Sequence, residues 1–97
     1  MDTDQFLKCI ADPNRRTILN CIGSKELCVN DIVEATKLEQ TLVSFHLKSL
    51  RICGLVVSRR EGKCILYRIS DEIIMDLLKN IESVSKKVKG TGGKHGC

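Results

Sequence analysis

The spacing of apolar residues changes twice along the chain, and this change constrains the fold more than any other feature. From residue 6 to residue 52, apolar side chains recur at the three- and four-residue intervals of helices. Between residues 55 and 69, apolar and β-branched residues flank a turn that contains glycine, and helical spacing returns after residue 70. One hairpin within a helical pattern predicts a mainly α-helical domain that carries a single β-hairpin.

Capping residues divide the first half of the chain into four expected helices. Asp2 and Asp12 are placed as N-caps of the first two helices, and proline follows Asp12 at the first helical position. A short third helix is expected over residues 30–36 and a fourth over residues 40–52, with Gly54 ending it. A short helix, a tight turn, a second helix and a hairpin together form a winged helix-turn-helix.

The last helix carries more apolar surface than one small domain needs. Its apolar stripe runs from Ile73 to Val84 at intervals of three and four residues, which favours a homodimer. The expected order is α-α-α-α-β-β-α, with residues 1–88 forming the DNA-binding and dimerisation domain. Residues 89–97 are rich in glycine and lysine and are predicted to be a disordered tail.

Basic residues gather in the middle of the chain. Residues 41–68 contain six Lys or Arg and one Glu, whereas the whole 97-residue chain has a net charge of +4. This distribution predicts a face that meets a polyanion such as double-stranded DNA, and the alternative is a solvated charged surface. Neither a signal peptide nor a membrane-spanning stretch is evident, so we expect a cytoplasmic protein with no membrane partner.

The cysteines do not form a recognisable metal or redox motif. None lies within three residues of another, which argues against a zinc ribbon and a thioredoxin-type pair. In a reducing compartment they are expected to be thiols. No catalytic residue set is suggested, so the sequence predicts neither an enzyme nor a cofactor. The six cysteines are Cys9, Cys21, Cys28, Cys53, Cys64 and Cys97.

The second helix of the pair is expected to enter the major groove with its N-terminal end first. Gln40 is suited to bidentate pairing with adenine, and Thr41 and Ser44 to contacts with bases or phosphates. Phe45 either lies against a thymine methyl group or packs against the partner helix. Lys48 is expected to contact phosphate, which adds affinity without sequence information.

The hairpin is expected to add three further contacts. Arg59, Arg60 and Lys63 are predicted at the wing tip, where they would reach the neighbouring backbone or the minor groove. His46, within the fourth helix, is expected to pack in the domain and form a backbone hydrogen bond rather than bind DNA or metal.

Four segments resemble, in order and spacing, the ArsR/SmtB winged-helix repressors. These segments are "ADPNRRTIL", "ELCVNDIV", "TLVSFHLKSLRICGLV" and "SRREGKCILYRIS". The resemblance covers about residues 5–75 and is most specific from Ser44 to Val56. It implies a cytoplasmic homodimer, joined through its first and last helices, that binds an inverted repeat in a promoter. It also implies release by an inducer, usually a metal ion or a thiol-oxidising signal.

The metal sites of this family are incomplete in the sequence. Where relatives open the third helix with several cysteines, only Cys28 matches, because Asn30 and Val33 occupy the other positions. One sulfur cannot build a soft thiolate site. On the last helix only Asp71 matches the zinc-type site. The sequence therefore predicts none of the family's usual metal sites, and we assign no metal ligand.

Thiol sensing stays open. The redox members of the family pair a cysteine of the second helix with one of the last helix, whereas here Cys21 is out of register and residues 72–88 contain no cysteine. The alternative is a set of inert buried thiols, at Cys9, Cys21 and Cys53. The sensor candidates are Cys28, Cys64 and Cys97.

The sequence supports a DNA-binding transcriptional regulator, expected to be a repressor, with two alternatives. We expect it to bind an inverted repeat as a homodimer and to be released by a thiol-directed signal, either redox or a soft metal, and the inducer itself is left unknown. One alternative is a winged-helix module for protein interaction without specific DNA binding, for which Glu39 and Phe45 are the unusual residues. The other is a constitutive repressor without metal sensing.

Overall fold

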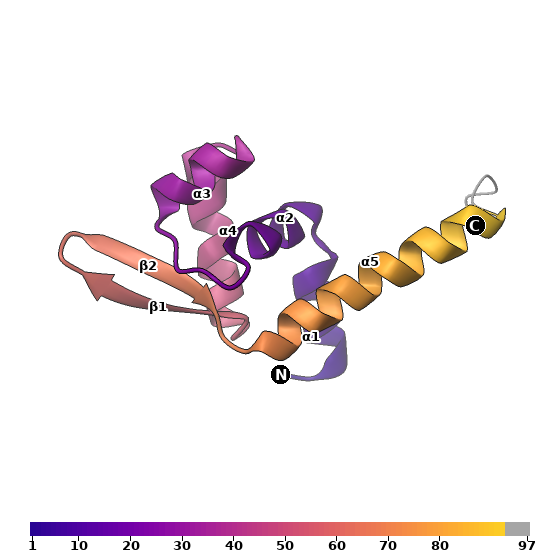
Figure 1. Ribbon diagram of the computed structural model, residues 1–97. Helices are drawn as coiled ribbons and strands as arrows, with labels where there is room; N and C mark the ends of the chain where they lie inside the picture. The colour runs from indigo at the N-terminus through magenta and orange to yellow at the C-terminus, as the bar shows by residue number, and fades with distance from the viewer. Residues whose placement is uncertain (93–97) are drawn as a thin grey trace.

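The computed structural model describes the backbone of residues 1–92 and the side chains of residues 1–88. Its element order confirms the predicted winged helix-turn-helix. In Figure 1 the helices α2, α3 and α4 form the body, the hairpin projects from one side and α5 from the other. The elements are α1 (Thr3–Ala11), α2 (Pro13–Ile22), α3 (Val29–Thr36), α4 (Gln40–Ile52), β1 (Val56–Glu61), β2 (Cys64–Ile69) and α5 (Glu72–Gly92).

The core lies where α2, α3 and α4 meet, and it extends to Val56 and Ile69 at the base of the hairpin. On α4 the buried positions Val43, Leu47 and Leu50 follow the four- and three-residue spacing that puts them on one helix face. Leu55 and Val56 close the core where the chain leaves α4 and enters the hairpin. The side chains with no solvent exposure are Ile18, Leu19, Ile22, Ile32, Val43, Leu47 and Leu50.

Asp12 fixes the start of α2. Its Oδ1 accepts hydrogen bonds from the backbone N–H groups of Asn14 at 2.8 Å and Arg15 at 3.1 Å. Burial alone would raise the pKa of Asp12, but these two bonds and the electrostatic effect of the nearby His46 and Arg15 side chains outweigh it. The pKa of Asp12 therefore lies below its ordinary value of 3.8.

Replacing Asp12 with Ala is expected to lower the free energy of unfolding by about 1 kcal/mol, because two N–H groups at the helix start lose their acceptor. Asp12→Asn, which keeps an acceptor oxygen, is the matched control. Since the folded pKa is lowered, the stability from the charge is present above pH 3.8 and is lost as the pH falls through the folded value. Urea unfolding at neutral pH and near pH 3 measures both effects. Equal stability of Asp12→Ala and wild type at neutral pH would contradict this account of the cap.

The turn of the hairpin is shorter than predicted. As a result, Arg59 and Arg60 lie at other positions than expected. The antiparallel register runs from Val56 opposite Ile69 to Glu61 opposite Cys64, which leaves a two-residue turn. Gly62 adopts a φ of 63° in this turn, a conformation that glycine adopts without steric cost. Arg59 and Arg60 therefore lie within β1, and only Lys63 lies at the wing tip. The prediction that all three occupy the tip was wrong, because the strands pair down to Glu61.

A contact that the sequence did not indicate ties the α2–α3 connection to the hairpin. The backbone N–H of Leu27 donates to the Tyr67 carbonyl at 3.0 Å, and the Tyr67 N–H donates to the Leu27 carbonyl at 2.8 Å. This bridge brings Glu26 and Cys28, on either side of Leu27, next to the wing.

Helix α5 begins as predicted and continues further than expected. Asp71 Oδ1 accepts a hydrogen bond from the Ile73 N–H at 3.0 Å, and the helix runs to Gly92, beyond the expected domain end at residue 88. Ile74 and Leu78 pack into the core, whereas the side chains of Ile73 and Val84 are 67% and 60% exposed. The expected disordered tail thus starts within a helix, and residues 93–97 lie outside the described part of the chain.

Across residues 1–92, no helix combines the length and the hydrophobicity needed to span a membrane.

Candidate nucleic-acid interface

The polar face of α4 is open to solvent over its first three turns. The same helix buries Val43 and Leu47 against α2 and α3, so its opposite side must face outward. The exposed positions match the predicted set for DNA contact. They are Gln40, Thr41, Ser44, Phe45 and Lys48.

Phe45 was expected either to lie against a thymine methyl group or to pack against the partner helix, and its exposure bears on this choice. Its side chain is 58% exposed, so it does not pack into the core of the described domain. Its only ring contact among the described residues is an edge-to-face arrangement with His46, with ring centroids 5.3 Å apart. An exposed aromatic ring between Ser44 and the buried His46 presents apolar surface at the same face as the polar candidates.

The wing does not present its basic residues equally. Arg59 donates two hydrogen bonds to the Glu26 carboxylate, from Nε and Nη2, both at 2.8 Å. A third contact joins Arg59 Nη1 to Glu61 Oε2 at 3.3 Å. The hydrogen bonds from Arg59 lower the pKa of Glu26, and Glu26 in turn raises the pKa of Arg59. The charge of Arg59 is thus paired with two carboxylates. Arg60 and Lys63 are exposed without a carboxylate partner among the described residues.

His46 is buried as expected, but its hydrogen bond differs from the prediction. It is 4% exposed, and its Nδ1 accepts a hydrogen bond from Arg15 Nε at 3.3 Å. Its Nε2 lies 3.9 Å from Asp12 Oδ1. The expected backbone partner was wrong, because α2 places two charged side chains beside the ring. His46 therefore joins α4 to the start of α2.

The structure brings two of the three sensor candidates to one pocket. Cys28 is the N-cap of α3, and its thiol donates to Asp31 Oδ2 at 3.2 Å. Cys64 is exposed in β2, and both cysteines line a pocket of about 270 Å³ with Lys63 and Tyr67. Cys97 lies outside the described residues.

Two cysteines that were expected to be thiols form a disulfide in the structure. Cys9 of α1 and Cys53 at the C-terminus of α4 form a disulfide, with their Cα atoms 6.8 Å apart. The other cysteines in the described part, Cys21, Cys28 and Cys64, are free. No motif signalled the pair, because the two residues lie 44 positions apart in the sequence.

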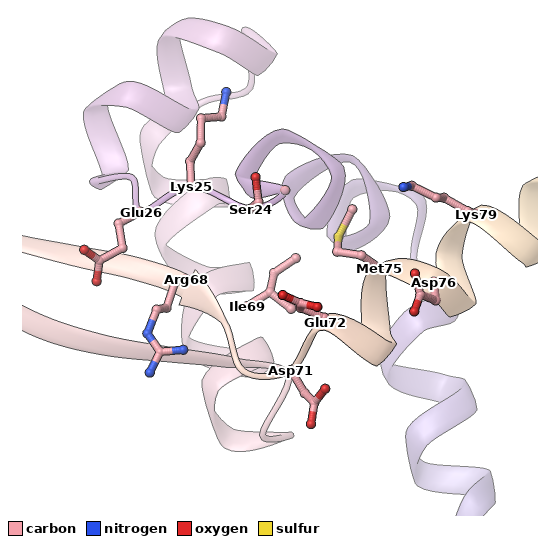
Figure 2. Close-up of a pocket in the computed structure, with 11 residues that line it drawn as sticks. Ser24, Lys25, Glu26, Arg68, Ile69, Asp71, Glu72, Met75, Asp76 and Lys79 are labelled. Carbon is pink, nitrogen blue, oxygen red and sulfur yellow. The ribbon is translucent and has the colours of Figure 1, made fainter.

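A charged hollow beside the start of α5 does not form a metal site. It lies between the α2–α3 connection, the end of β2 and the start of α5, and Figure 2 shows that the carboxylates of Asp71, Glu72 and Asp76 do not converge. Lys25, Arg68 and Lys79 supply opposite charge around it. Across the described residues, no three His, Cys, Asp or Glu side chains gather in a way that could hold a metal ion.

Comparison with known proteins identifies relatives across most of the chain. Residues 12–58 match the family described as "Bacterial regulatory protein, arsR family". The Arsenical resistance operon repressor of Staphylococcus xylosus is 30% identical over 90 residues, which cover 93% of this chain and 86% of that protein. The Transcriptional repressor SmtB homolog of Synechocystis sp. is 34% identical over 77 residues, which cover 79% of this chain and 58% of that protein. The chain therefore spans less than two thirds of the length of this second relative.

A solved structure agrees with the fold. The homodimeric winged helix-turn-helix DNA-binding domain of a possible ArsR-family transcriptional regulator from Mycobacterium bovis superposes with a TM-score of 0.78 at 31% sequence identity. The match covers 92% of this chain and 86% of that domain.

Proposed function

The chain belongs to the ArsR family of bacterial regulatory proteins, and from this premise we propose that it is a cytoplasmic transcriptional repressor. It binds an inverted repeat in double-stranded DNA as a homodimer, with half-sites about one helical turn apart. It has no catalytic role. A thiol-directed signal lowers its affinity for DNA or restores it.

The exposed face of α4 supports this proposal most directly. Gln40, Thr41 and Ser44 lie on the N-terminal half of a helix whose other side is anchored in the core, which is the arrangement that presents side chains to base edges. Lys48 lies one turn further along, where it is suited to a phosphate contact. Arg60 and Lys63 extend the basic surface onto the wing, and Arg59 is proposed to contribute less because Glu26 holds it.

The homodimer is proposed to form through α1 and α5. The exposed apolar side chains Leu7 of α1 and Ile73 and Val84 of α5 are 51%, 67% and 60% exposed. Apolar surface of this kind on two terminal helices is typical of an interaction site rather than of a monomer surface. A relative described as homodimeric shares the fold across 92% of this chain, which supports the same assembly here.

The second candidate function is a winged-helix module for protein interaction without specific DNA binding. The exposure of Phe45 favours it, since an exposed ring also suits a protein surface. The negative charge of Glu39 at the start of α4 also favours it, because this charge would lie close to DNA phosphate. Affinity for duplex DNA from the chain's own promoter, compared with a scrambled duplex, separates the two functions.

Two substitutions on α4 are expected to act differently on DNA binding. Lys48→Ala should weaken binding to all duplexes by a similar factor and reduce the salt dependence, because it removes a phosphate contact. Gln40→Ala should instead reduce discrimination at one base pair by about 1–3 kcal/mol, because it removes a base contact. Fluorescence anisotropy against promoter DNA and single-base variants measures both.

Lys79→Ala is the matched control, since Lys79 is an exposed lysine away from α4 and the wing, and it lines the charged hollow rather than belonging to the apolar stripe of α5. Its binding curve should match that of the wild type. Equal effects of Lys48→Ala and Lys79→Ala, or no preference for promoter DNA in the wild type, would contradict the proposed function.

A further inference from the structure

A disulfide joins α1 to the far end of the proposed recognition helix. Cys9 is 1% exposed within α1, whereas Cys53 is half-buried at the C-cap of α4. We propose that this pair is a reversible dithiol–disulfide site whose disulfide form binds DNA more tightly than its dithiol form. The second half of this proposal rests on the proposed DNA-binding function.

The two sulfur atoms differ in access and in electrostatic environment. Cys53 is the sulfur that a reagent in solution can reach, because Cys9 is enclosed by the core. Arg15 Nη1 lies 3.8 Å from Cys9 Sγ, so a thiolate released on Cys9 would lie next to a guanidinium group. A positive charge of this kind favours the thiolate. Cys53 is therefore the attacked sulfur and Cys9 the better leaving group in thiol–disulfide exchange.

Reduction then proceeds by two exchange steps. The thiolate of a low-molecular-weight thiol attacks Cys53 Sγ, the disulfide bond breaks, and Cys9 leaves as a thiolate beside Arg15. A second thiol attacks the external sulfur of the mixed disulfide, which releases the Cys53 thiolate. The two external thiols leave as their own disulfide, having supplied two electrons, and their protons pass to solvent or to the cysteines.

Oxidation by hydrogen peroxide runs in the opposite direction. The Cys53 thiolate attacks one peroxide oxygen and becomes a sulfenic acid, while the hydroxide that leaves is protonated to water. The Cys9 thiolate then attacks the sulfenic sulfur and forms the disulfide. The second hydroxide is also protonated to water. Two thiols are oxidised and one peroxide is reduced to two molecules of water.

Arg15 provides the link between this site and the recognition helix. Its Nε donates to His46 Nδ1 at 3.3 Å, and His46 directly follows the exposed Phe45 on α4. Arg15 contacts His46 through Nε and Cys9 through Nη1. In the dithiol form, a thiolate on Cys9 attracts the guanidinium more strongly than the disulfide sulfur does and shifts it relative to His46, and the covalent tie to α4 is also lost. Both changes make α4 less ordered. A less ordered recognition element loses more conformational entropy when it binds DNA, which lowers the affinity.

The position of the disulfide leaves the proposed DNA-binding end of α4 open. Cys53 follows the last residue of α4, whereas Gln40 is its first residue. The bond therefore holds the helix without covering the surface that faces the groove. The disulfide form has a fixed recognition helix with its polar face exposed.

The experiment measures the full chain with promoter DNA after treatment with hydrogen peroxide or with dithiothreitol, and maps the disulfide by peptide mass spectrometry. We expect a Cys9–Cys53 linkage in the oxidised sample and DNA affinity about tenfold higher than in the reduced sample. A variant with Cys21, Cys28, Cys64 and Cys97 all changed to Ser should keep this difference. Cys53→Ser, at the half-buried position, should bind like the reduced wild type under both conditions.

Arg15→Gln tests the chemistry independently of DNA. Loss of the positive charge should slow the reduction of the linkage by dithiothreitol several-fold, because the Cys9 thiolate becomes a poorer leaving group. A purely structural role of Arg15 would leave this rate unchanged or raise it.

Three results would overturn the proposal. The first is oxidised protein without a Cys9–Cys53 linkage, and the second is equal DNA affinity of the two forms. The third is reversible formation of the linkage in a protein that binds DNA in neither state. This last result would refute the proposed DNA-binding function and the coupling, while the dithiol–disulfide site itself would stand.

Discussion

Raising the salt concentration from about 50 mM to about 200 mM is expected to weaken binding of the dimer to its operator by about a thousandfold or more. The reason is that phosphate contacts release counterions from DNA, and about six to ten such contacts per dimer give a steep dependence of affinity on salt. Lys48, Arg60 and Lys63, present twice in a homodimer, supply the charge for this number of contacts. Anisotropy titrations at four or five salt concentrations give the slope directly.

The variant Arg60→Ala provides an internal test of this prediction. It should lower the slope by about one for each phosphate contact that is removed, whereas Arg59→Ala should change it less because Glu26 already neutralises Arg59. These titrations are made at one fixed redox state of the cysteines. A wild-type affinity that is independent of salt would exclude binding through phosphate contacts and favour the protein-interaction alternative.

Leu47→Ala is expected to destabilise the domain by about 3–4 kcal/mol. Leu47 has no solvent exposure and lies at the centre of the α4 face that packs against α2 and α3, so truncation leaves a cavity in the close-packed core. A domain of this size has a total stability of about 5–15 kcal/mol, and this loss is a large part of it. Because α4 also carries the proposed DNA contacts, affinity should fall together with stability.

Urea unfolding at a fixed protein concentration measures the loss, since dimerisation makes the apparent stability depend on concentration. Ile52→Ala is the matched control, because Ile52 lies on the same helix and is 74% exposed. It should change the free energy of unfolding by less than about 0.5 kcal/mol. A loss below about 1 kcal/mol for Leu47→Ala would show that the packing of α4 against the core is looser than described.

The thiol chemistry proposed here differs from the arrangement that the family resemblance suggested. The resemblance implied a pair between the second and the last helix, and Cys21 lies in α2 without a cysteine partner in the described part of α5. The structure instead pairs Cys9 with Cys53 and places Cys28 and Cys64 at a separate pocket. Among the described residues, Cys64 is the cysteine that lines a pocket together with Cys28.

Local features of the sequence were sufficient to predict the order of the helices and strands. Asp2 and Asp12 cap helices at the positions expected from their side chains, because a cap depends only on the residues within three positions of it. The three- and four-residue spacing of Val43, Leu47 and Leu50 identified the buried face of α4 for the same reason. The exposed face, with Gln40 and Lys48, followed from it.

Contacts between distant segments were decided only by the tertiary structure. The Arg59–Glu26 ion pair and the Cys9–Cys53 disulfide join residues that are 33 and 44 positions apart. The Leu27–Tyr67 bridge places Glu26 beside the wing, and the packing of α1 and α4 on α2 brings the two sulfurs together. The helices, the hairpin and the polar face of α4 could be predicted from the sequence, since these depend on local periodicity and capping. Which charges are neutralised and which cysteines meet depends on how those elements pack, because packing fixes distances that no local pattern encodes.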